Sequence, residues 1–226
     1  MNLPNRLSML RICLVPLFVV AYFLPYYWCA YIAVGLFLLA AATDFLDGYI
    51  ARKYNMVTDL GKLLDPIADK ILVCAALFCV VAINPLMYLH YIDVACSMQQ
   101  WDVVSDHSWA VNFGTILLTV GAIIIISREL LISAVRQIAA SKGVVVQANV
   151  FGKIKTVFQD VSLPMLVLLS AARMQAITDI AIHNFHPSQF WIVWCWASIV
   201  LFGVAVILTM ISGVIYLVQN RKVFSN

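Results

Sequence analysis

Six long apolar stretches dominate the sequence and restrict the chain to a helical membrane protein. A membrane-spanning helix needs about 20 mainly apolar residues. Of the 226 residues, 64% are hydrophobic and 11% are charged, whereas a soluble domain carries about a quarter charged residues. The fold class predicted is all-α and polytopic, a single domain over residues 1–226 with six transmembrane helices. We place these helices near 8–27, 29–52, 60–84, 112–140, 154–174 and 189–218.

Basic residues gather on one side of this helical pattern. No Lys or Arg occurs between Lys70 and Arg128, and Arg173 is the only basic residue near the other ends of the predicted helices. Loops rich in Lys and Arg stay in the cytoplasm. The sequence therefore predicts that both termini are cytoplasmic and that the loop at about 85–111 is extracytoplasmic.

Four aspartates interrupt the apolar pattern between residues 44 and 69. Asp44 and Asp47 lie about 60° apart around the second predicted helix. Asp65 and Asp69 lie about 40° apart around the third. Each position is at or just inside the cytoplasmic end of its helix. An ionisable residue at membrane depth costs roughly 2.5–3.5 kcal/mol even on permissive insertion scales. A short connection makes the two helices antiparallel neighbours, so the two pairs can face each other.

Converging carboxylates favour a divalent metal site. Four negative charges repel one another strongly at low dielectric, and Mg²⁺ or Mn²⁺ prefers such oxygen ligands. The alternative is a structural ion network in which Arg52, Lys62 and Lys70 pair with the aspartates. Small residues at Gly48, Ala51 and Gly61 favour the ligand site, because a missing side chain lets a ligand approach the backbone.

The segment from Asp44 to Asp69 resembles the signature of the CDP-alcohol phosphotransferase family. It reads Asp44-x2-Asp47-Gly48-x2-Ala51-Arg52-x8-Gly61-x3-Asp65-x3-Asp69, and every fixed position is present. The resemblance implies a six-helix membrane fold, usually a homodimer, with a polar cavity open to the cytoplasm. It implies that the four aspartates hold one or two Mg²⁺ or Mn²⁺ ions, with two the expected number, and that Asp69 acts as general base. Residues that would border the cytidine diphosphate are Gly48, Ala51, Arg52 and Gly61.

Three further segments are similar to the phosphatidylglycerophosphate synthases of that family. They are Asn2-Leu3-Pro4-Asn5-Arg6-Leu7-Ser8-x2-Arg11, Arg128-Glu129 with Arg136, and Gly152-Lys153-x-Lys155-Thr156. The resemblance implies transfer of a phosphatidyl group from CDP-diacylglycerol to sn-glycerol 3-phosphate, giving phosphatidylglycerophosphate and CMP, with no nucleic-acid partner. It also suggests the bacterial cytoplasmic membrane, with the active site facing the cytoplasm.

The basic residues of these segments have two interpretations. Arg128, Arg136, Lys153 and Lys155 place positive charge near the predicted cavity, as an acceptor that carries its own phosphate would need. Alternatively they set the topology and contact anionic lipids, and Arg128 forms a structural pair with Glu129. Asn5 and Arg11 either line the donor site or anchor the first helix.

Other functions remain open at this point. A sister enzyme of the same family would use phosphatidylglycerol, to make cardiolipin, or inositol phosphate as its acceptor. A cation transporter would use the four aspartates as an ion path, but transport sites usually lie near the middle of the bilayer on broken helices. Here the carboxylates lie toward the cytoplasmic ends of helices, beside cations that oppose cation passage.

Overall fold

The computed structural model describes residues 3–54, 59–89, 108–141, 150–181 and 188–219. Within these ranges the chain forms long helices and no strand, so the all-α prediction is confirmed there. The long helices are α1 (Leu3–Phe23), α2 (Tyr27–Tyr54), α3 (Asp59–Ile83), α5 (Ser108–Ser141), α6 (Val150–Ala181) and α7 (Gln189–Gln219).

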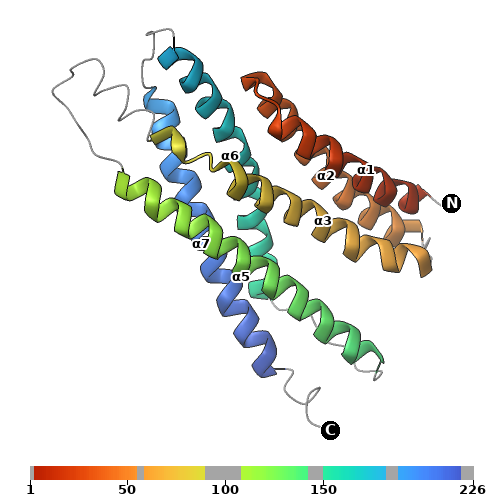
Figure 1. The fold of residues 1–226 in the computed structure, drawn as a ribbon. Helices are drawn as coiled ribbons and strands as arrows, with labels where there is room; N and C mark the ends of the chain where they lie inside the picture. Colours follow the sequence, from red (N-terminus) through yellow and green to blue (C-terminus); the bar gives the residue numbers. More distant parts are fainter. Residues whose placement is uncertain (1–2, 55–58, 90–107, 142–149, 182–187, 220–226) are drawn as a thin grey trace.

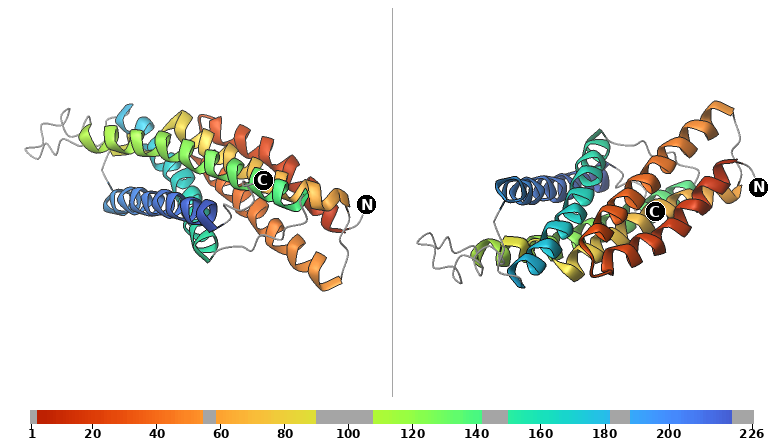
Figure 2. Two further views of the ribbon diagram at one scale, coloured as in Figure 1. Left: turned by 90° about the horizontal axis from the view of Figure 1, so that it is seen from below. Right: turned by 90° about the horizontal axis from the view of Figure 1, so that it is seen from above.

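The helices pack as two groups that share α6. Helices α1, α2 and α3 contact one another, and α5 and α6 each contact α7. Figure 1 shows α6 running between the first three helices and α7, and it contacts α2, α3 and α7. The two views in Figure 2 show the same grouping from below and from above. Because α5 also contacts α3, helices α3, α5 and α6 surround a common space.

Four helices are long and apolar enough to cross a membrane by themselves. These segments are Lys70–Leu89, Asn112–Ala139, Ile154–Asp179 and Gln189–Gln219, and shorter apolar helices cover Leu7–Phe23 and Tyr27–Thr43. Large apolar side chains point away from the bundle: Ile116 is 63% exposed, and Phe78 and Val193 are each 66% exposed. A surface of this kind suits lipid rather than water, because lipid tails are as apolar as the side chains.

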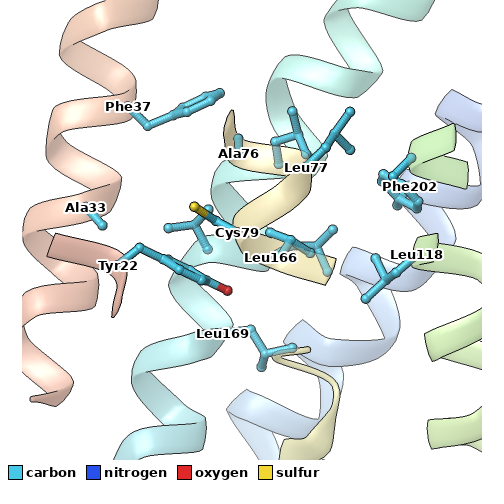
Figure 3. Close-up of a cluster of buried hydrophobic side chains, with 14 of the residues drawn as sticks. Tyr22, Ala33, Phe37, Ala76, Leu77, Cys79, Leu118, Leu166, Leu169 and Phe202 are labelled. Carbon is cyan, nitrogen blue, oxygen red and sulfur yellow. The ribbon is translucent and has the colours of Figure 1, made fainter. Parts of the chain in front are cut away.

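The hydrophobic core draws on all six long helices. Figure 3 shows Tyr22 of α1, Phe37 of α2, Cys79 of α3, Leu166 of α6 and Phe202 of α7 directed into the same region. Each of these side chains is at most 2% exposed, and Leu118 of α5 belongs to the same cluster. The core thus fixes α6 against both groups of helices.

Proline and asparagine explain where two of the helices end. The first helix was predicted over 8–27 but runs from Leu3 to Phe23. Pro25 disfavours helical backbone at the residue before it, and α2 begins at Tyr27. At the end of α3, Asn84 has a φ of 36°, a left-handed conformation that asparagine tolerates better than most residues. Its side-chain amide donates to Thr115 Oγ1 at 2.6 Å, which ties this end of α3 to α5.

We predict that Gly121→Ala weakens the packing of α5 on α7. An added Cβ would lie 2.7 Å from Phe202 Cε1 and 2.7 Å from Val206 Cγ2, so the neighbours must move, at a cost of about 1–3 kcal/mol. Gly35→Ala on α2 is the matched control, because no atom lies within 4 Å of its added Cβ. Thermal unfolding of both variants in one detergent should lower the midpoint only for Gly121→Ala. Equal midpoints would contradict the close packing.

Candidate active site

The carboxylate signature lies on two helices that contact each other. Helix α2 ends at Tyr54 and α3 begins at Asp59, so both halves of the signature lie near the connection between them. Figure 1 shows these ends at the same end of the bundle as the start of α1, which packs on both helices. The positions on α2 are Asp44, Asp47, Gly48, Ala51 and Arg52, and those on α3 are Gly61, Asp65 and Asp69. Their side chains lie outside the described part of the structure, so the facing of the two carboxylate pairs stays a prediction.

A cavity lies among α3, α5 and α6, and its lining begins on α3 where the signature ends. Its volume for water-sized molecules is about 60 Å³. Lys70, which contributes to the wall, follows Asp69 in the chain. The lining consists of Lys70, Val73, Cys74, Ile125, Ile126, Glu129, Leu130, Thr156, Gln159 and Asp160. Polar side chains from three helices therefore converge at one site in an otherwise apolar bundle.

Glu129 brings two of the predicted phosphate-binding residues together. Its Oε1 atom forms an ion pair with Lys155 Nζ of α6 and with Arg128 Nη1 of α5, the latter at 3.3 Å. Lys155 is only 1% exposed, so its charge is stable there because a carboxylate lies against it. The structural pairing of Arg128 with Glu129, one of the two interpretations from the sequence, is present in the structure. Since Glu129 also lines the cavity, the pairing places both cations next to it.

Arg128 also links α5 to α7. Its Nη2 atom donates to Ser212 Oγ at 3.1 Å. Gly213 lies against the aliphatic part of the side chain, since a Cβ added there would be 3.2 Å from Arg128 Cγ. A Cβ added at Gly152 of α6 would lie 3.8 Å from Nη2. The guanidinium group is therefore held at the junction of three helices.

The remaining predicted site residues lie apart from this cluster or outside the description. Arg136 lies eight residues beyond Arg128, about 12 Å along the helix, and its guanidinium carbon is 5.8 Å from the centre of the Tyr216 ring. That distance is typical of a cation–π contact. Arg11 is fully buried in α1. The side chains of Asn5 on α1 and Lys153 on α6 lie outside the described part of the structure.

Sequence reasoning did not single out Gln159 and Asp160 as site residues. Both line the cavity. Gln159 follows Lys155 by four residues, which places the two on one face of α6. A polar amide within a predicted span is costly and often functional, so its position in the 154–174 segment was a usable signal.

We predict that Glu129→Gln destabilises the protein more than the loss of a surface charge would. The neutral amide leaves the buried Lys155 ammonium without its carboxylate, at a cost of about 3 kcal/mol. The unfolding midpoint in detergent should fall by roughly 6–12 °C. Adding Lys155→Met should recover part of that loss, because the buried charge is then gone. Thr178→Ala, an exposed position on α6, serves as the control, and an unchanged midpoint in Glu129→Gln would refute the assigned role.

Comparison with known proteins places the chain in one family. The family model described as CDP-alcohol phosphatidyltransferase matches residues 1–220. A CDP-diacylglycerol–glycerol-3-phosphate 3-phosphatidyltransferase of Bacillus subtilis (strain 168) is 37% identical over 179 residues, covering 74% of this chain and 77% of the relative. Proteins of the same name from Escherichia coli (strain K12) and Salmonella typhimurium (strain LT2) are 34% identical over 222 residues, covering 97% of this chain and 95% of each relative. The chain belongs to the CDP-alcohol phosphatidyltransferase family.

Proposed function

We propose that this chain transfers the phosphatidyl group of CDP-diacylglycerol to sn-glycerol 3-phosphate, giving phosphatidylglycerophosphate and CMP. The observation that carries the proposal is similarity over nearly the whole chain to relatives named for this reaction, with 34% identity over 97% of the chain. The complete aspartate signature on α2 and α3 supports the phosphatidyl-transfer step. The polar cavity next to that signature supports a small acceptor that binds within the bundle.

The donor side of the site belongs to α1, α2 and α3. The oxygen atoms of the four aspartates are hard ligands, which fit Mg²⁺ or Mn²⁺. Two such ions would best balance the charge of four carboxylates. Such ions, when bound, withdraw charge from the phosphorus and stabilise departing CMP. Six residues would border the nucleotide: Asn5, Arg11, Gly48, Ala51, Arg52 and Gly61.

Asp69 would remove the acceptor proton. As the acceptor oxygen bonds to the phosphorus and the bond to CMP breaks, the hydroxyl becomes acidic and needs a nearby base. Asp69 lies one residue before Lys70, which lines the cavity. A hydroxyl in the cavity would therefore be close to this part of α3. The same carboxylate can also orient the hydroxyl before it reacts.

The cations of α5 and α6 would bind the phosphate group of the acceptor. Arg128 and Lys155 are already adjacent through Glu129, and a phosphate dianion could form charge-assisted hydrogen bonds with both. Arg136 and Lys153 would add positive charge along the approach to the site. An acceptor without any anionic group, such as inositol, would gain nothing from these side chains.

The proposed arrangement in the membrane has the active site facing the bacterial cytoplasm. Six helices would cross the inner membrane, with both termini on the cytoplasmic side and two copies of the chain forming a dimer. The distribution of basic residues supports this orientation. Lys70 at the start of the apolar segment Lys70–Leu89, Arg136 near the end of α5 and Lys155 near the start of α6 would all lie on the cytoplasmic side.

The test is a transfer assay with purified protein in detergent. We expect radiolabelled sn-glycerol 3-phosphate to enter the organic phase with CDP-diacylglycerol and Mg²⁺ or Mn²⁺, and EDTA to abolish this transfer. Asp69→Asn, which keeps the shape but removes the base, should slow transfer by about 10²–10⁴-fold. Full activity in EDTA or in Asp69→Asn would refute the metal and base assignments respectively.

Parallel reactions with phosphatidylglycerol and with inositol phosphate separate the family's other acceptors. Release of CMP only with one of these alcohols would keep the family and overturn the proposed acceptor. Folded protein that releases no CMP with any alcohol would overturn the enzymatic function itself.

A further inference from the structure

Gln159 carries a buried hydrogen-bonding group that the fold itself does not use. The residue is 3% exposed, and its Oε1 atom has no hydrogen-bond partner among the described residues. A buried amide oxygen without a partner lowers stability, and such groups are rare in native structures. The site is therefore complete only when a donor from elsewhere, a water or a ligand, reaches this oxygen.

The cavity that Gln159 lines is large enough for that donor to be a small polyol. About 10–15 Å³ of such space holds one water molecule. The cavity's volume of about 60 Å³ would thus hold several waters, or the three-carbon skeleton of a glycerol derivative. Apolar residues of α3 and α5, including Val73 and Ile125, form the rest of the wall.

The polar lining suits hydroxyl groups better than it suits a phosphate. Glu129, Gln159 and Asp160 all present oxygen acceptors, against a single ammonium group from Lys70 among the lining residues. Two carboxylates repel a phosphate dianion but accept hydrogen bonds from hydroxyls. The cations that would bind a phosphate, Arg128 and Lys155, do not line the cavity. Both are paired with Glu129, which does.

We infer that Gln159 is a specificity-determining residue, whose amide oxygen accepts a hydrogen bond from the acceptor's secondary hydroxyl. The inference rests on the proposed function, because it assumes that sn-glycerol 3-phosphate is the acceptor. Its primary hydroxyl attacks the phosphorus and its phosphate binds cations, so only the secondary hydroxyl is left to be recognised. A site built to bind a hydroxyl rejects an analogue that lacks it, since the buried partner then stays unpaired.

The experiment compares two acceptors in the same enzyme. 3-Hydroxypropyl phosphate keeps the phosphate and the primary hydroxyl of sn-glycerol 3-phosphate but lacks the secondary hydroxyl. We expect the wild-type protein to favour sn-glycerol 3-phosphate by at least about tenfold in kcat/KM. In Gln159→Leu, kcat/KM for sn-glycerol 3-phosphate should fall about tenfold while that for 3-hydroxypropyl phosphate changes less than about twofold. The preference should therefore disappear.

Two further variants separate recognition from structure. Gln159→Met keeps an unbranched side chain of similar length, and it decides the question if the leucine variant does not fold. Ser162→Ala, three residues further along α6, removes a buried hydroxyl that bonds to the backbone oxygen of Gln159 and should keep the wild-type preference. An equal fall for both acceptors in Gln159→Met, or a wild-type preference near one, would overturn the inference while transfer to sn-glycerol 3-phosphate still stands. Folded wild-type protein that uses neither acceptor would overturn the proposed function, and this inference with it.

Discussion

The ion pairing around Glu129 is the interaction on which the second half of the bundle depends. Lys155 is almost fully buried, and a buried cation is stable only beside an opposite charge. Glu129 of α5 supplies that charge to α6 and shares it with Arg128, which in turn binds Ser212 of α7. Glu129 thus ties α5 to α6, and Arg128 ties α5 to α7. A bundle held by apolar contacts alone would have much weaker control of the register of these helices, because lipid competes equally well for apolar faces.

The same pairing connects stability to substrate binding. Without a substrate, Glu129 balances the positive charge that an acceptor phosphate would need. When the phosphate binds, it would share Arg128 and Lys155 with Glu129. The two cations would then replace some of their contacts with the Glu129 carboxylate by contacts with the phosphate, and they would be paired both before and after binding. Under the proposed function the carboxylate would therefore limit the affinity for the phosphate, and it allows the cations to exist in the empty site. A moderate affinity for the acceptor suits an enzyme that must complete many catalytic cycles. Binding the substrate as tightly as the transition state would not raise kcat.

Much of the fold could be predicted from the sequence because a span of about 20 apolar residues leaves little freedom. The last predicted helix, 189–218, matches α7 almost residue for residue. The ends were harder where helices continue past the apolar stretch: α6 was predicted to end at 174 but reaches Ala181, and α5 was predicted from 112 but begins at Ser108. The predicted first helix, 8–27, continues past Pro25 and is wrong there, because a proline disfavours helical backbone at the residue before it. The helix in the structure ends at Phe23.

The site could be predicted only where its residues are close in sequence. Asp44 and Asp47 share a helix face by their spacing, and Arg128 stands next to Glu129 in the chain. The contact of Glu129 with Lys155 depends on how α5 packs against α6, and hydropathy carries no information about that packing. For Gln159 the sequence offers only a partial signal: an amide within a predicted span marks a polar position, but only the packing of α3, α5 and α6 shows that a cavity lies beside it.

The position of the polar groups argues for group transfer over ion transport. Transport sites usually lie on discontinuous helices near the middle of the bilayer, whereas α2 and α3 run without interruption through the signature segments that the structure describes. The cavity next to the signature is lined by Lys70, and Arg128 and Lys155 lie behind its Glu129 wall. These three cations would lower the energy of a phosphate ester bound near them, and Glu129 and Asp160 in the cavity lining would offset part of that effect. Under the proposed function the carboxylates would hold the metal, the cations would bind the acceptor phosphate and the amide would bind its hydroxyl, whereas a cation path would use the carboxylates alone.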